Sequence, residues 1–298
     1  MRMIQTAIDP GAGFCFGVTR VVEKAEEIIR WHGQLYCLGE IVHNRKEIER
    51  LEGLGLKTIT NDEYLRLSNC RVLIRAHGEP PETYAHAAAH NIELVDGTCP
   101  IVLRLQSRIK SDFNVNRDAG TQIVIFGKID HAEVRGLAGQ TAYKTIIVES
   151  ETDLVKVDFS KPVHLYAQTT MSPENYNRLK AQIMSKALEA GLEPAAFKCT
   201  NSICGQVSGR VPKLKQFCRN HDLILFVSYK QSSNGKLLFA ECKSVNEKAY
   251  FVSETADINP GWFQDAGTVG ITGATSTPRW LLEEFAEFVK VILPCLPR

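Results

Sequence analysis

The feature that most constrains the fold of this chain is a repeated alternation of short apolar runs with amphipathic segments. Each run is rich in β-branched residues, ends in a small polar loop, and precedes a stretch with apolar residues at helical spacing. Because strands that alternate with helices pair in parallel, the pattern indicates an α/β fold with mostly parallel sheets. The expected strands are 3–9, 34–38, 71–76, 92–96, 122–126, 145–148, 163–167, 222–228, 249–252 and 268–272, with 57–60 as a weaker run.

The segments between these runs carry clear helix signals. Apolar residues recur at helical spacing from Val18 to Ile29, and Gly33 closes that segment. Pro100 and Pro173 are each expected in the first turn of a helix, where the missing N–H of proline costs no hydrogen bond. Helices are therefore expected to make the connections between the strands.

The composition is that of an ordinary globular protein, with 298 residues, 44% hydrophobic and 23% charged. A net charge of +1 provides no global attraction to nucleic acid or to an anionic membrane. No apolar stretch approaches the roughly 18–20 residues of a membrane span, and no signal peptide is recognisable. We therefore expect a cytoplasmic protein whose nine cysteines, spread along the chain, are thiols or metal ligands.

Ligands of parallel sheets bind beyond the carboxyl ends of the strands, so functional side chains are expected in the loops that follow the strands. Those loops offer thiols, imidazoles, hydroxyls, an amide and one carboxylate. The candidates are Cys15, His43, His77, Cys99, His131, Glu133, Thr169, Thr170, Cys204, Ser232, Ser233, Asn234, Thr275, Ser276 and Thr277.

Three of these candidates, Cys15, Cys99 and Cys204, stand where a loop enters an expected helix. The positive end of a helix favours a thiolate, which is the form that binds metal. Neutral donors at helix N-termini also bind phosphate groups without a cluster of lysines. The loops therefore favour a metal site, a phosphate site, or both.

Each candidate also has a purely structural interpretation. Serine and threonine cap helices at least as often as they bind ligands, and no C-x-x-C motif identifies a metal site by spacing alone. A single cysteine is commonly a small buried hydrophobe. We expect this of Cys37, Cys70, Cys199, Cys218, Cys242 and Cys295.

A glycine-rich turn after the first expected strand suggests a different class of enzyme. Gly11, Gly13 and Gly17 follow a strand and precede a helix, as in a dinucleotide-binding loop. The last glycine comes one residue late for G-x-G-x-x-G, and Glu40 lies farther along than the roughly 20 residues expected of the ribose ligand. A nicotinamide-dependent oxidoreductase stays open as the alternative. So does a non-enzymatic protein that binds a phosphometabolite, or one whose cysteines hold a structural zinc.

Nine segments, taken together and in order, resemble the 4-hydroxy-3-methylbut-2-enyl diphosphate reductase family, the iron–sulfur enzymes that end the methylerythritol phosphate route to isoprenoids. They run from Gly13 to Pro278 and so span nearly the whole chain. The segments are "GFCFGV", "EIVHN", "RAHGEP", "DGTCPIV", "DHAEVRGLAGQ", "AQTTMS", "SIC", "SSN" and "GATSTP".

The resemblance implies three similar α/β lobes around a central cleft, each with a small, mostly parallel sheet. Lobe 1 would comprise residues 15–99, lobe 2 residues 100–199, and lobe 3 residues 200–298 together with 1–14. The implied activity is oxidoreduction, the reductive dehydroxylation of 4-hydroxy-3-methylbut-2-enyl diphosphate to isopentenyl and dimethylallyl diphosphate. Electrons would come from a partner protein, a ferredoxin or a flavodoxin.

By the same resemblance, Cys15, Cys99 and Cys204 would each hold one iron of a 4Fe–4S cluster, with Cys199 as the alternative to Cys204. The remaining iron, with no cysteine ligand, would be open to the hydroxyl of the substrate. Glu133 would be the proton source, assisted by the catalytic residues His131 and Thr169. The substrate-binding set would be His43, His77, His131, Thr169, Ser232, Ser233, Asn234 and Ser276.

Overall fold

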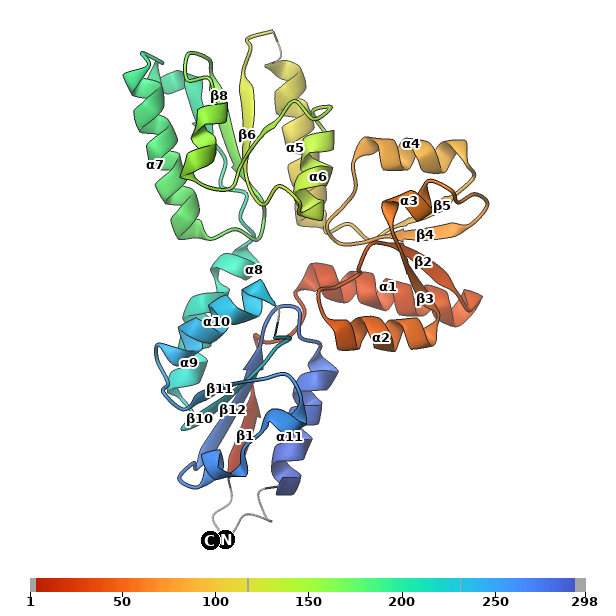
Figure 1. Cartoon of the computed structure of the whole chain (residues 1–298), viewed down its shortest axis with the longest axis vertical. Helices are drawn as coiled ribbons and strands as arrows, with labels where there is room; N and C mark the ends of the chain where they lie inside the picture. Colours follow the sequence, from red (N-terminus) through yellow and green to blue (C-terminus); the bar gives the residue numbers. More distant parts are fainter. Residues whose placement is uncertain (1–3, 117, 231, 293–298) are drawn as a thin grey trace. The chain divides into compact units, whose positions relative to one another are not determined.

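The structure is a computed structural model that describes residues 4–116, 118–230 and 232–292, except the side chains of Val207, Ser233 and Ile292. The described residues form three four-stranded sheets in which every pair of neighbouring strands is parallel (Figure 1). They separate into two compact units. The first combines Met1–Thr19, Val42–Leu54 and Gly209–Arg298, and the second combines Arg20–Ile41 and Gly55–Ser208.

The first unit contains one sheet, with strand order β1-β12-β10-β11. The first strand of the chain pairs with its last strand, so the red β1 lies beside the blue β12 in Figure 1. The strands are β1 (Gln5–Ile8), β10 (Leu223–Val227), β11 (Ala249–Val252) and β12 (Thr268–Gly273). The helices are α2 (Arg45–Leu54), α9 (Arg210–Arg219), α10 (Ser233–Lys243) and α11 (Arg279–Ile292), with short 3-10 turns η3 (Thr255–Asp257) and η4 (Pro260–Phe263).

Both faces of strand β10 are buried, which explains why its sequence is a continuous apolar run, LILFV. Alternate residues of the strand face opposite ways, as the pleat requires. Leu225 packs in a cluster with Phe285 of α11, whereas Phe226 packs in a second cluster with Leu214 of α9 and Cys242 of α10. The helices thus cover the two faces of the sheet, and the loops lie at the carboxyl-terminal ends of its strands.

The second unit contains two sheets. One has strand order β3-β2-β4-β5 and the other β7-β6-β8-β9. The strands are β2 (Leu35–Leu38), β3 (Leu56–Ile59), β4 (Arg71–Ile74), β5 (Glu93–Asp96), β6 (Gln122–Phe126), β7 (Ile146–Val148), β8 (Val163–Ala167) and β9 (Phe197–Cys199). The helices are α1 (Phe16–His32), which begins in the first unit, α3 (Asn61–Tyr64), α4 (Pro81–Ala89), α5 (Pro100–Val115), α6 (Ala132–Gly139), α7 (Pro173–Glu189) and α8 (Gly205–Ser208), with 3-10 turns η1 (Glu151–Lys156) and η2 (Pro194–Ala196).

The packing of β6 decides where the site-bearing helices of this unit lie. Val124 and Phe126 pack in one cluster with residues of α7. Ile123 and Ile125 pack in another with residues of α5 and α6. Helices α5 and α6 therefore share one face of the sheet, which brings the segment that starts at Pro100 close to the one that starts at Ala132.

The expected α/β fold with small parallel sheets is confirmed, and so is each expected strand, with ends that differ by a residue or two. Met3, at the start of the first expected strand, lies outside the described residues, as does Cys295. Pro100 and Pro173 are the first residues of α5 and α7, as predicted. One strand, β9, has no counterpart among the predictions. Within the described ranges, no helix is both long and apolar enough to cross a bilayer.

Candidate functional site

Glu133 is a carboxyl group held almost entirely out of water, with 1% of its surface exposed. It lies in the first turn of α6, and its two oxygens accept separate hydrogen bonds from Thr169, the second residue after β8. The Thr169 backbone N–H donates to Oε1 and its hydroxyl donates to Oε2, each at 2.7 Å. Burial raises the pKa of Glu133 to about 7, although the two bonds from Thr169 act in the opposite direction.

His131 caps the same helix. Its Nδ1 accepts the backbone N–H of Glu133 at 3.1 Å, which satisfies one of the unpaired N–H groups of the first turn. Because Nδ1 is the acceptor, a neutral His131 carries its proton on Nε2. The helix cap therefore fixes both the orientation and the tautomer of this imidazole.

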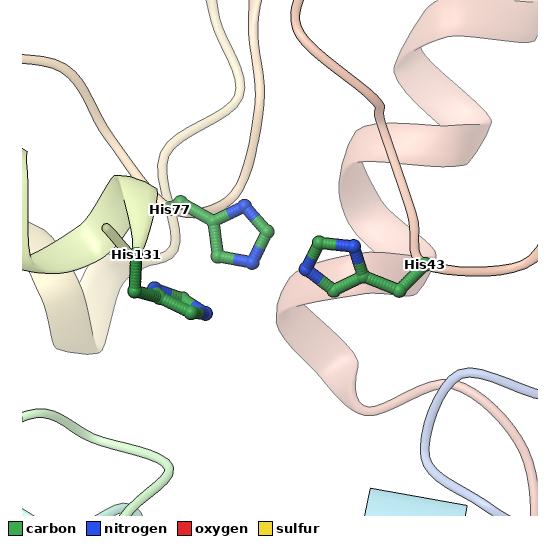
Figure 2. A group of neighbouring side chains, drawn as sticks. All are labelled: His43, His77 and His131. Atoms are coloured by element: carbon green, nitrogen blue, oxygen red, sulfur yellow. The ribbon is translucent and has the colours of Figure 1, made fainter. Parts of the chain in front are cut away.

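The ring of His131 meets the ring of His77 edge to face, with centroids 5.1 Å apart and planes at 87° (Figure 2). His77 follows β4, and His131 follows β6, so the two rings come from two different sheets of the second unit. Two imidazoles and a protonatable carboxyl group thus lie on neighbouring loops, which is suited to binding an anion and delivering a proton to it.

Two of the candidate cysteines lie on loops that are hydrogen-bonded to these same residues. The backbone N–H of Cys204 donates to the carbonyl oxygen of Thr169 at 2.8 Å. The backbone N–H of Cys99 donates to the carbonyl oxygen of Ala76, next to His77, at 3.0 Å. Each cysteine immediately precedes a helix, α8 and α5 respectively. The second unit therefore ties one cysteine to the loop of Thr169, which holds the acid, and the other to the loop of His77.

Cys15, in the first unit, stands at the start of α1. Its carbonyl oxygen accepts the N–H groups of Val18 and Thr19, each at 2.9 Å. The loop from β1 turns at Gly13, whose φ of +108° strains any residue with a side chain. This turn provides the physical reason for a glycine there.

The described thiols differ in exposure: Cys15, Cys70, Cys99 and Cys204 are half-buried, Cys199 is exposed, and Cys37, Cys218 and Cys242 are buried. Cys15, Cys99 and Cys204 each directly precede a helix, whereas Cys70 directly precedes strand β4. By contrast, Cys37 is fully buried, and burial raises the pKa of its thiol to about 12, which opposes metal binding. Taken one by one, the thiols at positions 15, 99 and 204 are thus accessible enough to ligate a metal, which the fully buried thiol of Cys37 is not.

The serine candidates lie in the first unit together with Asn234, Thr275 and Thr277, at the carboxyl ends of β10 and β12, which are adjacent strands. Ser232 caps α10, with its hydroxyl accepting the N–H of Gly235 at 3.0 Å. The amide of Asn234 donates to the hydroxyl of Thr275 at 2.8 Å, so the loop of Ser276 is tied to the start of α10. The side chain of Ser233 lies outside the description.

His43 also belongs to the first unit, where it is exposed and directly precedes the cap of α2. The side chain of Asn44 accepts the N–H of Glu47 at 3.1 Å, which makes Asn44 the capping residue. Glu47 does not reach back to complete a capping box, because its carboxylate bonds with Arg50 and with the indole N–H of Trp280.

Two charged pairs at the strand ends were not among the candidates. Glu79, 1% exposed, pairs with Arg135 at 2.7 Å, and Asp9 pairs with Arg210 at 2.8 Å. The partners of each pair are far apart in the chain, so no local pattern marks them. The only signal in the sequence is that Glu79 and Arg135 each lie two residues beyond a candidate, His77 and Glu133 respectively.

Comparison with known sequences gives one consistent result. The family described as "LytB protein" matches residues 7–290. A 4-hydroxy-3-methylbut-2-enyl diphosphate reductase of Bacteroides thetaiotaomicron is 46% identical over 292 residues, covering 98% of this chain and 99% of the relative. A reductase of the same name from Phocaeicola vulgatus is 48% identical over 283 residues, covering 95% and 97% of the two chains.

Solved structures agree with the sequence relatives. One, titled as (E)-4-hydroxy-3-methyl-but-2-enyl diphosphate reductase, the terminal enzyme of the non-mevalonate pathway, matches with a TM-score of 0.79 at 30% identity, covering 97% of this chain and all of the other. A reductase from Plasmodium falciparum matches with a TM-score of 0.77 at 26% identity, covering 97% and 88%. The comparisons support the resemblance found in the sequence and not the nicotinamide alternative.

Proposed function

Because this chain belongs to the LytB protein family, we propose that Cys15, Cys99 and Cys204 hold a 4Fe–4S cluster in which one iron has no cysteine ligand. The support from this chain is the donor set itself, three half-buried thiols at helix starts. When bound, the cluster supplies electrons and a Lewis-acidic iron. The chain's own residues bind the substrate, orient it and provide protons.

The enzyme is an oxidoreductase that converts 4-hydroxy-3-methylbut-2-enyl diphosphate to isopentenyl and dimethylallyl diphosphate, the last step of the methylerythritol phosphate pathway. The reaction removes a hydroxyl group. It consumes two electrons and two protons, and its other product is one water molecule. The protein must therefore deliver protons to a substrate that carries a negatively charged diphosphate.

In this proposal Glu133 is the acid that donates a proton as the C4–oxygen bond of the substrate breaks and water leaves. The observation that carries this role is the burial of Glu133 together with its two bonds to Thr169. With a pKa of about 7, the carboxyl group is substantially protonated near neutral pH and yet acidic enough to give the proton up.

Thr169 and His131 act beside Glu133. The Thr169 hydroxyl holds one carboxylate oxygen and so lies where it can orient both the acid and the substrate hydroxyl. His131, with its proton on Nε2, offers a donor from a ring that its helix cap holds in position. We propose that it helps to hold the substrate and to relay protons to Glu133.

The diphosphate is proposed to bind imidazoles, hydroxyls and one amide, with helix N-termini adding favourable dipoles. Support for this comes from the tied loops of Ser232, Asn234 and Thr275 and from the paired rings of His77 and His131. The proposed set is His43, His77, His131, Thr169, Ser232, Ser233, Asn234 and Ser276.

We further propose three lobes, 15–99, 100–199 and 200–298 with 1–14, since each sheet takes its strands from one of these stretches. The enzyme would work in the cytoplasm and receive its electrons from a ferredoxin or flavodoxin.

The decisive experiment is anaerobic purification, with iron and sulfide assayed per chain and turnover followed by product analysis. A chemical reductant replaces the electron-donor protein, so that the test does not depend on knowing the donor. We expect a coloured protein that yields both products. A colourless protein that takes up no iron on reconstitution would contradict the cluster proposal, whereas a loaded but inactive protein would contradict the proposed residue roles.

A further inference from the structure

The segment that follows His77 is packed directly onto helix α6, which carries Glu133. At Gly139, a side chain would overlap the ring of Pro80, so only glycine allows this approach. The hydroxyl of Tyr143, just beyond α6, donates to Glu82 on the first turn of α4. These contacts join two loops that come from different sheets of the second unit.

An ion pair between a buried carboxylate and a partly exposed guanidinium lies at the centre of this contact. The Nη2 of Arg135, on α6, donates to Oε2 of Glu79 at 2.7 Å. The second oxygen of Glu79 lies 3.8 Å from Nη2 of Arg75. Glu79 is 1% exposed, Arg75 is 13% exposed and Arg135 is 39% exposed. The free energy needed to remove the Glu79 carboxylate from water offsets much of the attraction between the charges. The pair therefore adds little to the stability of the protein, but it fixes how the two segments lie relative to each other.

Both partners of the pair are close in sequence to the proposed site. Glu79 is two residues after His77, and Arg135 is two residues after Glu133 and one helical turn after His131. The backbone N–H of Arg135 donates to the carbonyl oxygen of His131 at 3.1 Å, so the guanidinium and the capping imidazole share one turn. A shift of Glu79 relative to Arg135 therefore moves His77 relative to His131.

We propose that Glu79 and Arg135 are positioning residues, whose ion pair fixes the His77 turn against α6 so that His77 and His131 together bind the diphosphate of the substrate. This inference rests on the proposed function of the two histidines and goes beyond it, because neither Glu79 nor Arg135 has a role there. Neither is a catalytic residue, since each acts through a neighbouring histidine.

The pair affects binding more than chemistry because the acid has its own supports. Glu133 is held by two bonds to Thr169, and α6 packs against α5 through Leu137 and Ile109. The hydrogen bonds of the His77 turn to its surroundings include two from the start of α5, the Cys99 N–H to the Ala76 carbonyl at 3.0 Å and the Gln106 amide to the Glu79 carbonyl at 3.4 Å, whereas the Glu79–Arg135 pair links the turn to α6. Breaking the pair should therefore free the His77 turn and leave Glu133 in place.

The test is the double variant Glu79→Gln/Arg135→Gln in the anaerobically purified holoenzyme. Removing both charges leaves neither Glu79 nor Arg135 unpaired. Arg75 loses its contact with Glu79 in this variant and keeps its hydrogen bond to the Glu40 carbonyl oxygen, so Tm is measured beside the kinetics. We expect KM to rise about ten-fold, because the substrate should lose roughly one hydrogen bond to a charged group. We expect kcat to stay within about two-fold of the parent, because Glu133 is undisturbed.

A binding measurement accompanies the kinetics and does not depend on turnover. Inorganic diphosphate is titrated into the holoenzyme by calorimetry, and its Kd should rise by the same factor of about ten in the double variant. Arg135→Lys, which keeps the charge opposite Glu79, should restore both KM and Kd to near the parent values.

The matched control is Arg71→Gln/Glu93→Gln. That pair has the same length, 2.7 Å, and joins the amino ends of β4 and β5, at the other end of the sheet from His77. It should leave KM and Kd unchanged. Equal KM in the parent and in Glu79→Gln/Arg135→Gln, with only a lowered Tm, would reduce the pair to a structural role and overturn the proposal.

Failure of the underlying function looks different. If the parent itself binds no diphosphate, or if His77→Ala binds it as well as the parent, then the histidine assignment is wrong. If the parent and the histidine variant behave as expected but the double variant binds normally, the positioning inference alone is wrong.

Discussion

Thr169 donates to both carboxylate oxygens of Glu133, once through its backbone N–H and once through its hydroxyl. The two residues are on different loops, after β8 and after β6, and those strands are neighbours in one sheet. One threonine therefore orients the carboxyl group completely, and its own carbonyl oxygen accepts the N–H of Cys204. Hydrogen bonds through Thr169 therefore connect Glu133, the proposed acid, with Cys204, a proposed cluster ligand.

Glu133→Gln tests the acid role directly. The amide has the same shape as the carboxyl group but cannot give up a proton, so kcat should fall by about 10²–10⁴-fold. Iron content and substrate affinity should stay close to those of the parent. The control is Glu151→Gln, an exposed carboxylate at the start of η1, which should have no effect. Normal turnover in Glu133→Gln would assign the proton to another group.

Thr169→Val tests how the pKa of Glu133 is set. The valine keeps the backbone N–H bond and removes the hydroxyl bond, which acts to lower this pKa. The pKa of Glu133 should therefore rise above about 7. Because the acid acts in its protonated form, activity falls as pH rises through this pKa. In a plot of kcat against pH, the pH at which kcat falls (the position of the falling limb) should therefore increase by roughly one unit, because one hydrogen bond contributes about that much to a pKa.

The matched control for that experiment is Thr169→Ser, which retains a hydroxyl and should keep the limb at the pH of the parent. The position of the limb is the readout rather than the height of kcat, since Thr169 is also proposed to orient the substrate. A limb that stays in place, or that moves to lower pH in Thr169→Val, would show that Glu133 is not the titrating group.

Cys204→Ser should lower the iron and sulfide found per chain after anaerobic purification, because a hydroxyl is a poor ligand for iron in such clusters. Cys199 provides the control. It is only five residues away but is exposed, at the end of the edge strand β9, and Cys199→Ser should keep the cluster. The reverse pattern would transfer the role of third ligand to Cys199.

The fold was largely predictable because both faces of most strands are buried, so the apolar runs stand out from the loops. Strand β9 was not predicted, and its residues show why. Its three residues, Phe197–Cys199, include an exposed lysine and an exposed cysteine, and the strand pairs only with β8. A short edge strand is specified by its neighbour rather than by its own pattern, which a sequence does not reveal.

The loops that carry the site were predictable for a related reason. Parallel strands end at one edge, so the residues after β4, β6 and β8 were expected near ligands. The contacts between those loops were not predictable. Glu79 and Arg135 are 56 residues apart, and their pairing depends on how α6 packs against the turn after β4.

Asp9 and Arg210 give a final prediction that concerns stability. The pair is 2.8 Å long with both side chains 5% exposed, and Arg210 also donates to Thr272. Asp9→Asn leaves the guanidinium buried without a countercharge and should destabilise the protein by about 3–5 kcal/mol, measured as a fall in Tm. Glu287→Gln, which breaks an exposed pair with Lys290 on α11, should change Tm little.

The double variant Asp9→Asn/Arg210→Met separates two explanations of that loss. If the cost comes from the stranded charge, removing the arginine as well should recover most of the Tm. If instead the carboxylate is needed for its bond to the N–H of Gly11, which is 2.8 Å long and starts the turn toward Cys15, the double variant should stay as unstable as Asp9→Asn. We expect recovery, because the asparagine side-chain oxygen can still accept that N–H.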